Sequence, residues 1–215
     1  MRARGWLDAG QCQDLVGVDI AKAGDNLLIE EQVANAALGS GFVSRLNREI
    51  RIKRGLSYGA RSSLDARRDV GPFMATAQTK NQSAAEVANL MQVELKRMRS
   101  EPVQGDELKS RQAVITGGYA RNLETNGGFV GKISAMITND LPLDTLNKFI
   151  PAINAVTSAD VTAFATKYFD TPPSLIIIGK APEFIEPLKK DFHDVKVIPV
   201  PELDLNRAEL TKAKP

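Results

Sequence analysis

The residues with the clearest chemical potential lie in one stretch, residues 38–59, LGSGFVSRLNREIRIKRGLSYG. Arg51 lies at the end of a basic, helix-like pattern, and Tyr58 follows a few positions later, across a break at Gly55. A guanidinium offers a rigid fork of donors that stays charged, and a tyrosine hydroxyl donates one hydrogen bond at neutral pH. A break between helix and strand allows the two side chains to point at one place. We therefore expect Arg51 and Tyr58 to act together.

Histidine and cysteine content limits the chemistry that this chain can perform by itself. The only histidine is His193, near the C-terminal end, so the chain cannot complete a histidine-based metal or triad site. His193 lies close to Asp191 and Asp194, but its place at a predicted helix end favours a surface residue. The lone Cys12 excludes an internal disulfide and a cysteine-rich zinc site, and no local signature supports a nucleophile pair with His193.

Length and composition are those of an ordinary globular domain. The chain has 215 residues, 43% of them hydrophobic and 25% charged, and a formal net charge of +2. That charge is too small to indicate nucleic acid or a membrane surface by itself. The longest apolar run, residues 175–178, is far too short to span a membrane. Residues 1–12 contain basic residues but no following apolar segment, so we expect no signal peptide, and the location stays open between bacterial periplasm and cytoplasm.

The first third of the chain predicts a strand and hairpin region over about 11–80. Alternation predicts strands near 11–20, 56–61 and 73–79, and helical periodicity predicts a helix over 26–38. A second helix follows the glycines at 39 and 41, with one apolar and one charged face. Its apolar face is predicted to hold Phe42, Leu46 and Ile50, and its other face Arg45, Arg48, Glu49 and Lys53.

The rest of the chain predicts a helical block over about 83–169, followed by closing strands and a tail over about 174–215. Ser83 with Glu86, and Thr157 with Asp160, are spaced as capping boxes at the start of two helices. Further helices are expected over 107–123, 127–139, 143–153 and 182–192. Residues 174–179 predict a strand buried on both faces if it is central, and residues 195–200 predict a last strand. We expect one domain over 1–215, of the α+β class, with an antiparallel or mixed β-sheet and helices packed on one face.

Several of these residues form a motif that resembles a known family. The specific part is residues 38–42 (LGSGF), 44–46 (SRL), 51–54 (RIKR) and 55–59 (GLSYG), with further agreement at residues 107–108, 123–125, 155–157 and 176–179. In these segments the chain is similar to the pitrilysin/insulinase/mitochondrial-processing-peptidase superfamily of zinc metallopeptidases, the inverzincins. More narrowly, it looks like their C-terminal, non-catalytic ("inactive") domain. The resemblance extends from about residue 11 to residue 179.

The resemblance implies one half of an enzyme of the processing-peptidase type. Catalytic halves of this superfamily carry H-x-x-E-H, with two histidines and a carboxylate on zinc, and this chain has no such motif. We therefore expect no metal and no cofactor in this chain, zinc in an H-x-x-E-H partner domain or subunit, and a peptide substrate. The resemblance also implies that Arg51 and Tyr58 reach the substrate at the partner's zinc, where donors stabilise a developing oxyanion.

Other interpretations of the same residues stay open. A structural scaffold subunit could keep the fold without any part in proteolysis. A nucleic-acid binder could use the arginines and lysine at positions 45, 48, 51, 53, 54, 61, 67 and 68, but aromatic residues are only 6% of the chain. Without the resemblance, Arg51 would be a solvated charge and Tyr58 a half-buried strand residue. Gly39 and Gly41 form a turn rather than a phosphate cradle, since Phe42 follows where a P-loop requires Gly-Lys-Ser/Thr.

Overall fold

A four-stranded antiparallel sheet forms the base of the molecule. The computed structural model describes residues 11–20, 27–64, 71–170 and 173–213, with residues 11–20 and 27–28 described by their backbone alone. The strands are β1 (Gln11–Ile20), β2 (Ser57–Leu64), β3 (Gly71–Lys80) and β4 (Ser174–Ile178). Their order across the sheet is β2-β3-β1-β4, and each neighbouring pair is antiparallel.

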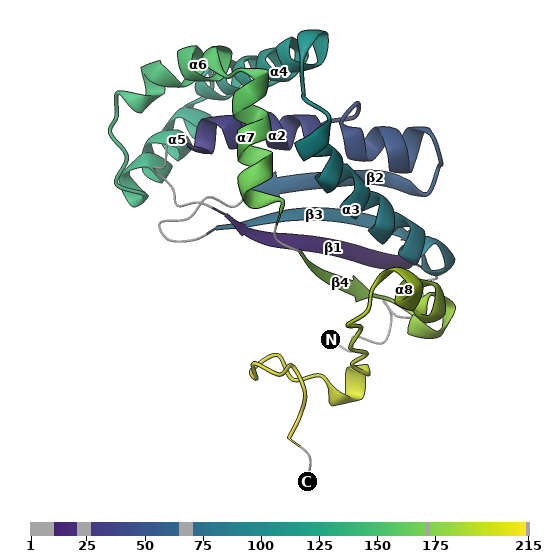
Figure 1. The fold of residues 1–215 in the computed structure, drawn as a ribbon. Helices are drawn as coiled ribbons and strands as arrows, with labels where there is room; N and C mark the ends of the chain where they lie inside the picture. The colour runs from purple at the N-terminus through teal and green to yellow at the C-terminus, as the bar shows by residue number, and fades with distance from the viewer. Residues whose placement is uncertain (1–10, 21–26, 65–70, 171–172, 214–215) are drawn as a thin grey trace.

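Helices lie on one side of this sheet, with α2, α3 and α7 nearest to it and α4 to α6 farther from β4 (Figure 1). Their bounds are α2 (Leu27–Leu38), α3 (Ala84–Ser100), α4 (Gly105–Leu123), α5 (Asn126–Thr138), α6 (Thr145–Ala155), α7 (Ser158–Tyr168) and α8 (Ile185–Asp191). Short turns of other helix types are η1 (Asn47–Ile52), η2 (Asn81–Ser83), η3 (Ala181–Glu183) and η4 (Val200–Glu202). The predicted α+β class, with helices on one face of an antiparallel sheet, is confirmed.

The core lies between the sheet and the helices that cover it. Along β3 every second residue is buried, and Phe73, Ala75 and Ala77 are each at most 2% exposed. Phe73 packs against Phe169 with ring centroids 5.0 Å apart, and Phe169 meets Phe164 of α7 edge-on at 5.7 Å. The alanines on β3 leave room for α2 and α3 to approach the sheet closely. This packing fixes β2 and β3, and therefore the segment that joins η1 to β2.

In the C-terminal part, the predicted strand over 174–178 is present and the predicted last strand is not. Burial on both faces was expected only for a central position, and β4 is an edge strand: Ile176 and Ile178 are 50% and 61% exposed, while Leu175 and Ile177 are half-buried. An apolar run alone cannot distinguish an edge position from a central one, because the distinction depends on which strands pair with it. Residues 195–199 form no strand, and the chain extends away from the sheet there (Figure 1).

The two predicted capping boxes have different outcomes. Thr157 and Asp160 form the reciprocal pair: the Asp160 backbone N–H donates to Thr157 Oγ1, and the Thr157 backbone N–H donates to the Asp160 carboxylate at 2.8 Å. Ser83 precedes α3 but makes no side-chain cap hydrogen bond. The Glu86 carboxylate instead lies 3.8 Å from the Arg54 guanidinium, an ion pair between elements that local spacing could not predict.

Candidate functional site

The turn that leads into η1 is fixed by a close approach between α2 and β2. A side chain at Gly39 would place a Cβ 2.3 Å from the Ser62 backbone nitrogen, so only glycine fits there. The Ser62 backbone N–H donates to the Gly39 carbonyl at 3.2 Å. Gly41 follows with a φ of 100°, in the left-handed region that favours glycine. These two glycines set the direction in which the next helical segment leaves the sheet.

That segment ends in η1, a π-helical turn with a buried side and an exposed side. Leu46 and Ile50 are fully buried, as predicted, but Phe42 is 58% exposed, so the prediction that Phe42 shares their inward face is wrong. The turn after Gly41 separates Phe42 from the helix and directs it outward. The Lys53 backbone N–H donates to the Arg48 carbonyl at 2.9 Å, a bond that widens the helix by one residue.

Arg51 lies on the exposed side of η1 and rests on an aromatic ring. The carbon at the centre of its guanidinium group lies 4.7 Å from the centroid of the Phe42 ring. Arg51 makes no ion pair with any residue in the described part of the chain. A guanidinium above an exposed ring gains about 0.5–1 kcal/mol, enough to favour one orientation without occupying the donors.

Tyr58 is presented by an irregularity in β2. The register with β3 shifts between Ser57 and Ala60, which places Tyr58 in a β-bulge with its side chain 91% exposed. The Ser57 hydroxyl holds the bulge by donating to the Gln78 carbonyl at 2.6 Å and accepting from the Gly59 backbone N–H at 3.1 Å. Bulges of this kind redirect a side chain, and they are over-represented beside active sites.

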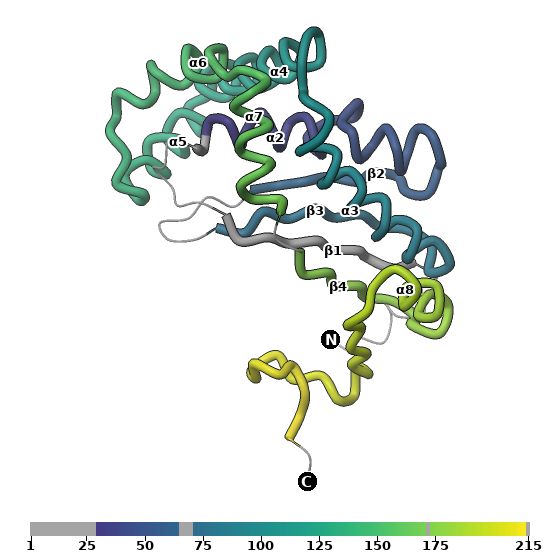
Figure 2. The backbone as a smooth tube through the Cα atoms, in the orientation of Figure 1, coloured from purple at the N-terminus to yellow at the C-terminus, as the bar shows by residue number. Residues whose placement is uncertain are grey.

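The chain reverses between η1 and β2, so Arg51 and Tyr58 lie on two adjoining elements (Figure 2). Gly55 makes the reversal with a φ of 64°, and its backbone N–H donates to the Arg51 carbonyl at 3.0 Å. The Leu56 backbone N–H donates to the Ile50 carbonyl at 2.9 Å, which closes the turn. Both side chains are exposed, and no hydrogen bond between the two is present. Arg51 and Tyr58 are therefore two separate, exposed donors on adjoining elements.

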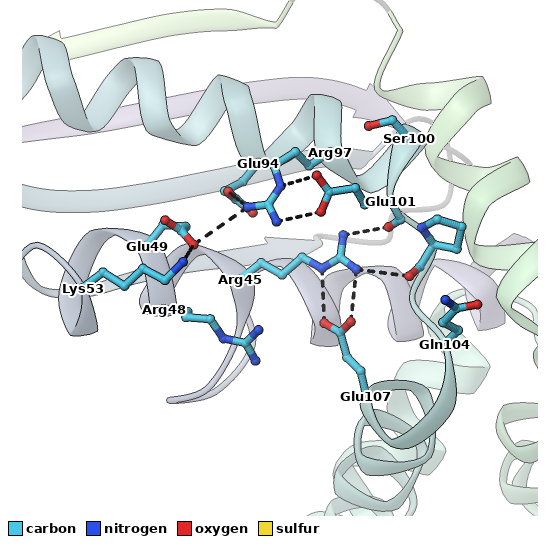
Figure 3. Close-up of a pocket in the computed structure, with 11 residues that line it drawn as sticks. Arg45, Arg48, Glu49, Lys53, Glu94, Arg97, Ser100, Glu101, Gln104 and Glu107 are labelled. Atoms are coloured by element: carbon cyan, nitrogen blue, oxygen red, sulfur yellow. Dashed lines mark hydrogen bonds and ion pairs between the residues drawn. The ribbon is translucent and has the colours of Figure 1, made fainter.

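The opposite side of η1 borders a charged crevice of about 470 Å³, formed with the end of α3 and the start of α4 (Figure 3). Arg45 crosses it and makes a two-point contact with the Glu107 carboxylate, at 3.2 Å from Nε and 3.1 Å from Nη2. Its Nη1 also donates to the Glu101 carbonyl at 2.9 Å. Arg45 lies on the charged face of the helix, as predicted, but it is only 7% exposed. The partners that bury it belong to α4 and to the segment before α4.

Three further charged residues in the crevice show how η1 is held against α3. Glu49 accepts hydrogen bonds from Lys53 and Arg54, and although burial raises the pKa of Glu49, these bonds outweigh it and lower the pKa. Glu94 of α3 is 1% exposed, and burial raises its pKa, partly opposed by a 2.6 Å hydrogen bond from Arg97. Arg97 also lies 3.8 Å from Glu49, which connects the two helical segments.

Other candidate residues are placed away from any built site. His193 is exposed in the segment after α8, as expected of a surface histidine. Within the described ranges no group of three His, Cys, Asp or Glu side chains could hold a metal ion. In the same part of the chain, no helix has the length and apolar character needed to cross a membrane. Arg67, Arg68 and the side chain of Cys12 lie outside what the structure describes.

Comparison with known proteins assigns the fold and site to a class. Residues 13–114 match the family model of the peptidase M16 inactive domain, a range that contains η1, the bulge and the crevice. A curated relative, an uncharacterized zinc protease of Streptomyces coelicolor, is 30% identical over 150 residues, which is 68% of this chain and 32% of the relative. The chain thus spans about a third of that protein's length.

Solved structures agree with this class. A peptidase M16 inactive domain from Pseudomonas fluorescens is 26% identical with a TM-score of 0.72, over 79% of this chain and 41% of that one. A chain in the complex III2 structure of Candida albicans has the same fold at 13% identity, with a TM-score of 0.72 over 82% of this chain and 45% of that one. Residues 13–114 thus match the peptidase M16 inactive domain, in agreement with the resemblance that the motif at residues 38–59 indicated.

Proposed function

We propose that this chain is the substrate-contacting, non-catalytic half of a zinc metallopeptidase. In this proposal an H-x-x-E-H domain or subunit of the same superfamily supplies zinc, and the two halves enclose a peptide. Arg51 and Tyr58 are this chain's contributions to the joint site. The length of a zinc-protease relative supports a separate catalytic half. The region matched by this chain covers only 32% of that relative, and the inactive domain is one part of such a protein.

The observation that carries the proposal is the exposure of two unpaired donors on rigid supports. Tyr58 is 91% exposed although aromatic rings usually bury most of their area, and Arg51, on the adjoining η1, makes no ion pair with any described residue. When a peptide bond is hydrolysed, its carbonyl oxygen gains negative charge, and donors already in place stabilise that charge. The Tyr58 hydroxyl donates to this oxygen, and the Arg51 guanidinium binds neighbouring peptide carbonyls.

The test is hydrolysis of a mixed peptide library by this chain, by an H-x-x-E-H half of the superfamily, and by the two together, with zinc content measured in each. Activity is expected only in the mixture. Tyr58→Phe removes one donor and is expected to lower kcat by about 10²- to 10³-fold. Tyr168→Phe is the matched control, since it removes a half-buried hydroxyl on α7, away from the site.

Arg51→Gln is paired in the same way with Arg61→Gln, which removes an exposed arginine on β2. We expect the first change to weaken hydrolysis and the second to leave it unchanged. Zinc and activity in this chain alone would contradict the proposal. So would full activity of the mixture in both Tyr58→Phe and Arg51→Gln.

The scaffold alternative is favoured by one observation, the shared fold with a chain of the Candida albicans complex III2 structure. A scaffold has no use for exposed unpaired donors, so it predicts a stable complex whose properties do not change in the Arg51 and Tyr58 variants. A nucleic-acid binder is disfavoured because Arg45 and Arg54 are paired with carboxylates. Binding to single-stranded nucleic acid that falls steeply with added salt would support that function instead.

A further inference from the structure

Asn47 is a buried amide at the junction of three elements. It begins η1 and is 7% exposed. Its Nδ2 group donates to the Gly41 carbonyl at 2.9 Å and to the Ser44 hydroxyl at 3.2 Å. Its Oδ1 accepts from the Ala60 backbone N–H at 3.0 Å. One side chain therefore links the turn before η1 with the strand that follows it.

The Oδ1 end of this amide supports the bulge that presents Tyr58. Ala60 is the residue at which β2 regains its register with β3, and it is 1% exposed. Without Asn47 its backbone N–H would be buried and unpaired, which costs free energy unless the strand shifts. Gly59 lies against the same atom, since a Cβ at Gly59 would be 3.8 Å from Asn47 Oδ1. The bulge is thus shaped around the Asn47 carbonyl oxygen.

The Nδ2 end supports the ring beneath Arg51. Its acceptors, the Gly41 carbonyl and the Ser44 hydroxyl, lie on either side of the exposed segment that carries Phe42. Phe42 is the ring on which the Arg51 guanidinium rests. The same segment is also held by Arg111, whose Nη2 donates to the Val43 carbonyl at 2.9 Å, and by the Ser44 backbone N–H, which donates to the Gly41 carbonyl at 3.3 Å. The Asn47 amide adds the hydrogen bonds that tie this segment, and with it Phe42, to η1.

We propose that Asn47 is the positioning residue that sets Tyr58 and the Phe42–Arg51 pair relative to each other. This inference rests on the proposed function, because positioning has an effect on hydrolysis only if Arg51 and Tyr58 contact the substrate. Asn47 is buried, so its role is to position other residues and not to contact the substrate. Its amide is suited to the task because one group donates and the other accepts, so it serves both sides of the junction at once.

The first test reads geometry without any enzyme activity. Amide hydrogen exchange is measured at Ala60, and ¹⁹F NMR is recorded on chain labelled with 3-fluorotyrosine, with Tyr58→Phe used to assign the Tyr58 signal. Asn47→Leu keeps the number and branching of the side-chain heavy atoms and removes the polar atoms. We expect it to speed exchange at Ala60 at least about tenfold and to shift the Tyr58 signal. Gln112→Leu is the control, because the Gln112 amide links α4 to three carbonyls near the end of α6.

The second test asks whether Asn47 acts through Tyr58. In the mixture with the H-x-x-E-H half, Asn47→Leu is expected to lower kcat/KM about 10²-fold, the usual result of a small misplacement. Gln112→Leu should lower stability to a similar extent with kcat/KM unchanged. In a Tyr58→Phe background, the added loss from Asn47→Leu should be much smaller, since the two residues act as a unit.

The outcomes separate the two proposals. Unchanged Ala60 exchange in Asn47→Leu, or a kcat/KM loss that is fully retained in the Tyr58→Phe background, overturns the positioning role. If Tyr58→Phe and Arg51→Gln both keep full activity, the proposed function fails, while the NMR result still decides whether Asn47 sets Tyr58. Should Asn47→Leu not fold, Asn47→Asp replaces it: the acceptor to Ala60 is kept and the donors are lost. For Asn47→Asp we then expect wild-type exchange at Ala60 and a reduced kcat/KM. Adding Arg51→Gln should not lower kcat/KM further. If the losses of kcat/KM from the two substitutions add, the positioning role is contradicted.

Discussion

The two sides of η1 carry the same kinds of residue in opposite states. On the crevice side, Arg45 is 7% exposed and contacts Glu107 at two points, and Glu49 binds Lys53 and Arg54. On the outer side, Arg51 is exposed and rests on an uncharged ring. The residue types are alike, so only the partners differ. A paired cation stabilises the position of the helix, whereas Arg51, under the proposed function, uses its donors to bind the substrate.

Because of this difference, neither the net charge nor a run of basic residues indicates which cations are available to bind another molecule. Residues 45–54 hold five cations and one carboxylate, and three of these cations are paired: Arg45 with Glu107, and Lys53 and Arg54 with Glu49. What remains on the outer side is a small set of donors on a rigid support. Substitutions on either side of η1 test this contrast.

The largest effect is expected from Arg45→Leu, on the crevice side. It removes the two-point contact to Glu107 and a hydrogen bond to the Glu101 carbonyl, and it leaves Glu107 without its cation. Breaking such a partly buried pair should lower the free energy of unfolding by about 3 kcal/mol. Urea unfolding measures this change.

Lys148→Ala is the matched control, because Lys148 pairs with Asp144 on the surface, where both side chains are more than half exposed. An exposed pair of this kind contributes about 0–1 kcal/mol. If Arg45→Leu costs no more than Lys148→Ala, the crevice side does not hold η1, and the contrast between its two sides is lost.

A buried carboxylate without a partner gives the next prediction. Glu31 of α2 is fully buried, and neither of its oxygens has a hydrogen-bond partner among the described residues. Burial raises the pKa of Glu31 from 4.5 to about 8. Between these values the native state binds more protons than the unfolded state. The stabilisation is therefore fully present below about pH 4.5 and is lost as the pH rises toward 8.

Urea unfolding from pH 5 to 8.5 checks this, with an expected fall of a few kcal/mol for the unmodified chain. Glu31→Gln removes the titration and should flatten the fall. Glu94, whose pKa is also raised, contributes in the same direction, so the difference between the two proteins isolates Glu31. Glu86→Gln, at an exposed residue, is the control. Equal pH dependence with and without Glu31→Gln would show that this carboxyl is solvated or paired in solution.

The sequence predicted a structural feature correctly when the residues that form it are close together in the chain. The β2–β3 hairpin and the Thr157–Asp160 cap were predicted correctly, because alternation and spacing are properties of neighbouring residues. The edge position of β4 and the burial of Arg45 were missed. They depend on β1 and on Glu107, which are distant in the chain.

Within the candidate site, the exposed positions of Arg51 and Tyr58 agree with the expectation from the motif at residues 38–59, although their chemical role stays a prediction. The role of Asn47 in linking the turn to β2 was not predicted. Asparagine at a helix start usually caps its own helix, and only the fold reveals a bond to Ala60.

A smaller loss of stability is expected from Gly39, where α2 and β2 meet through a backbone contact without charged groups. Gly39→Ala places a Cβ 2.3 Å from the Ser62 nitrogen and should cost about 1–3 kcal/mol through overpacking. Gly118→Ala is the control: no atom lies within 4 Å of its added Cβ, and alanine in a helix should stabilise the chain by about 0.5–1 kcal/mol. Thermal unfolding of both variants measures the difference, and a Gly39→Ala variant as stable as the original would mean that α2 and β2 lie farther apart in solution.

The smallest effect on stability is expected on the outer side of η1. Arg51→Ala removes only the contact with the Phe42 ring, worth about 0.5–1 kcal/mol, because no ion pair is lost within the described residues. Arg51→Lys keeps the charge above the ring and should change stability less, while it loses the fork of donors. Urea unfolding should therefore show little change in either variant, although both should weaken hydrolysis by the mixed halves. A loss of stability as large as that of Arg45→Leu would mean that Arg51 is a structural cation like those on the crevice side, and that its free donors are not kept for a substrate.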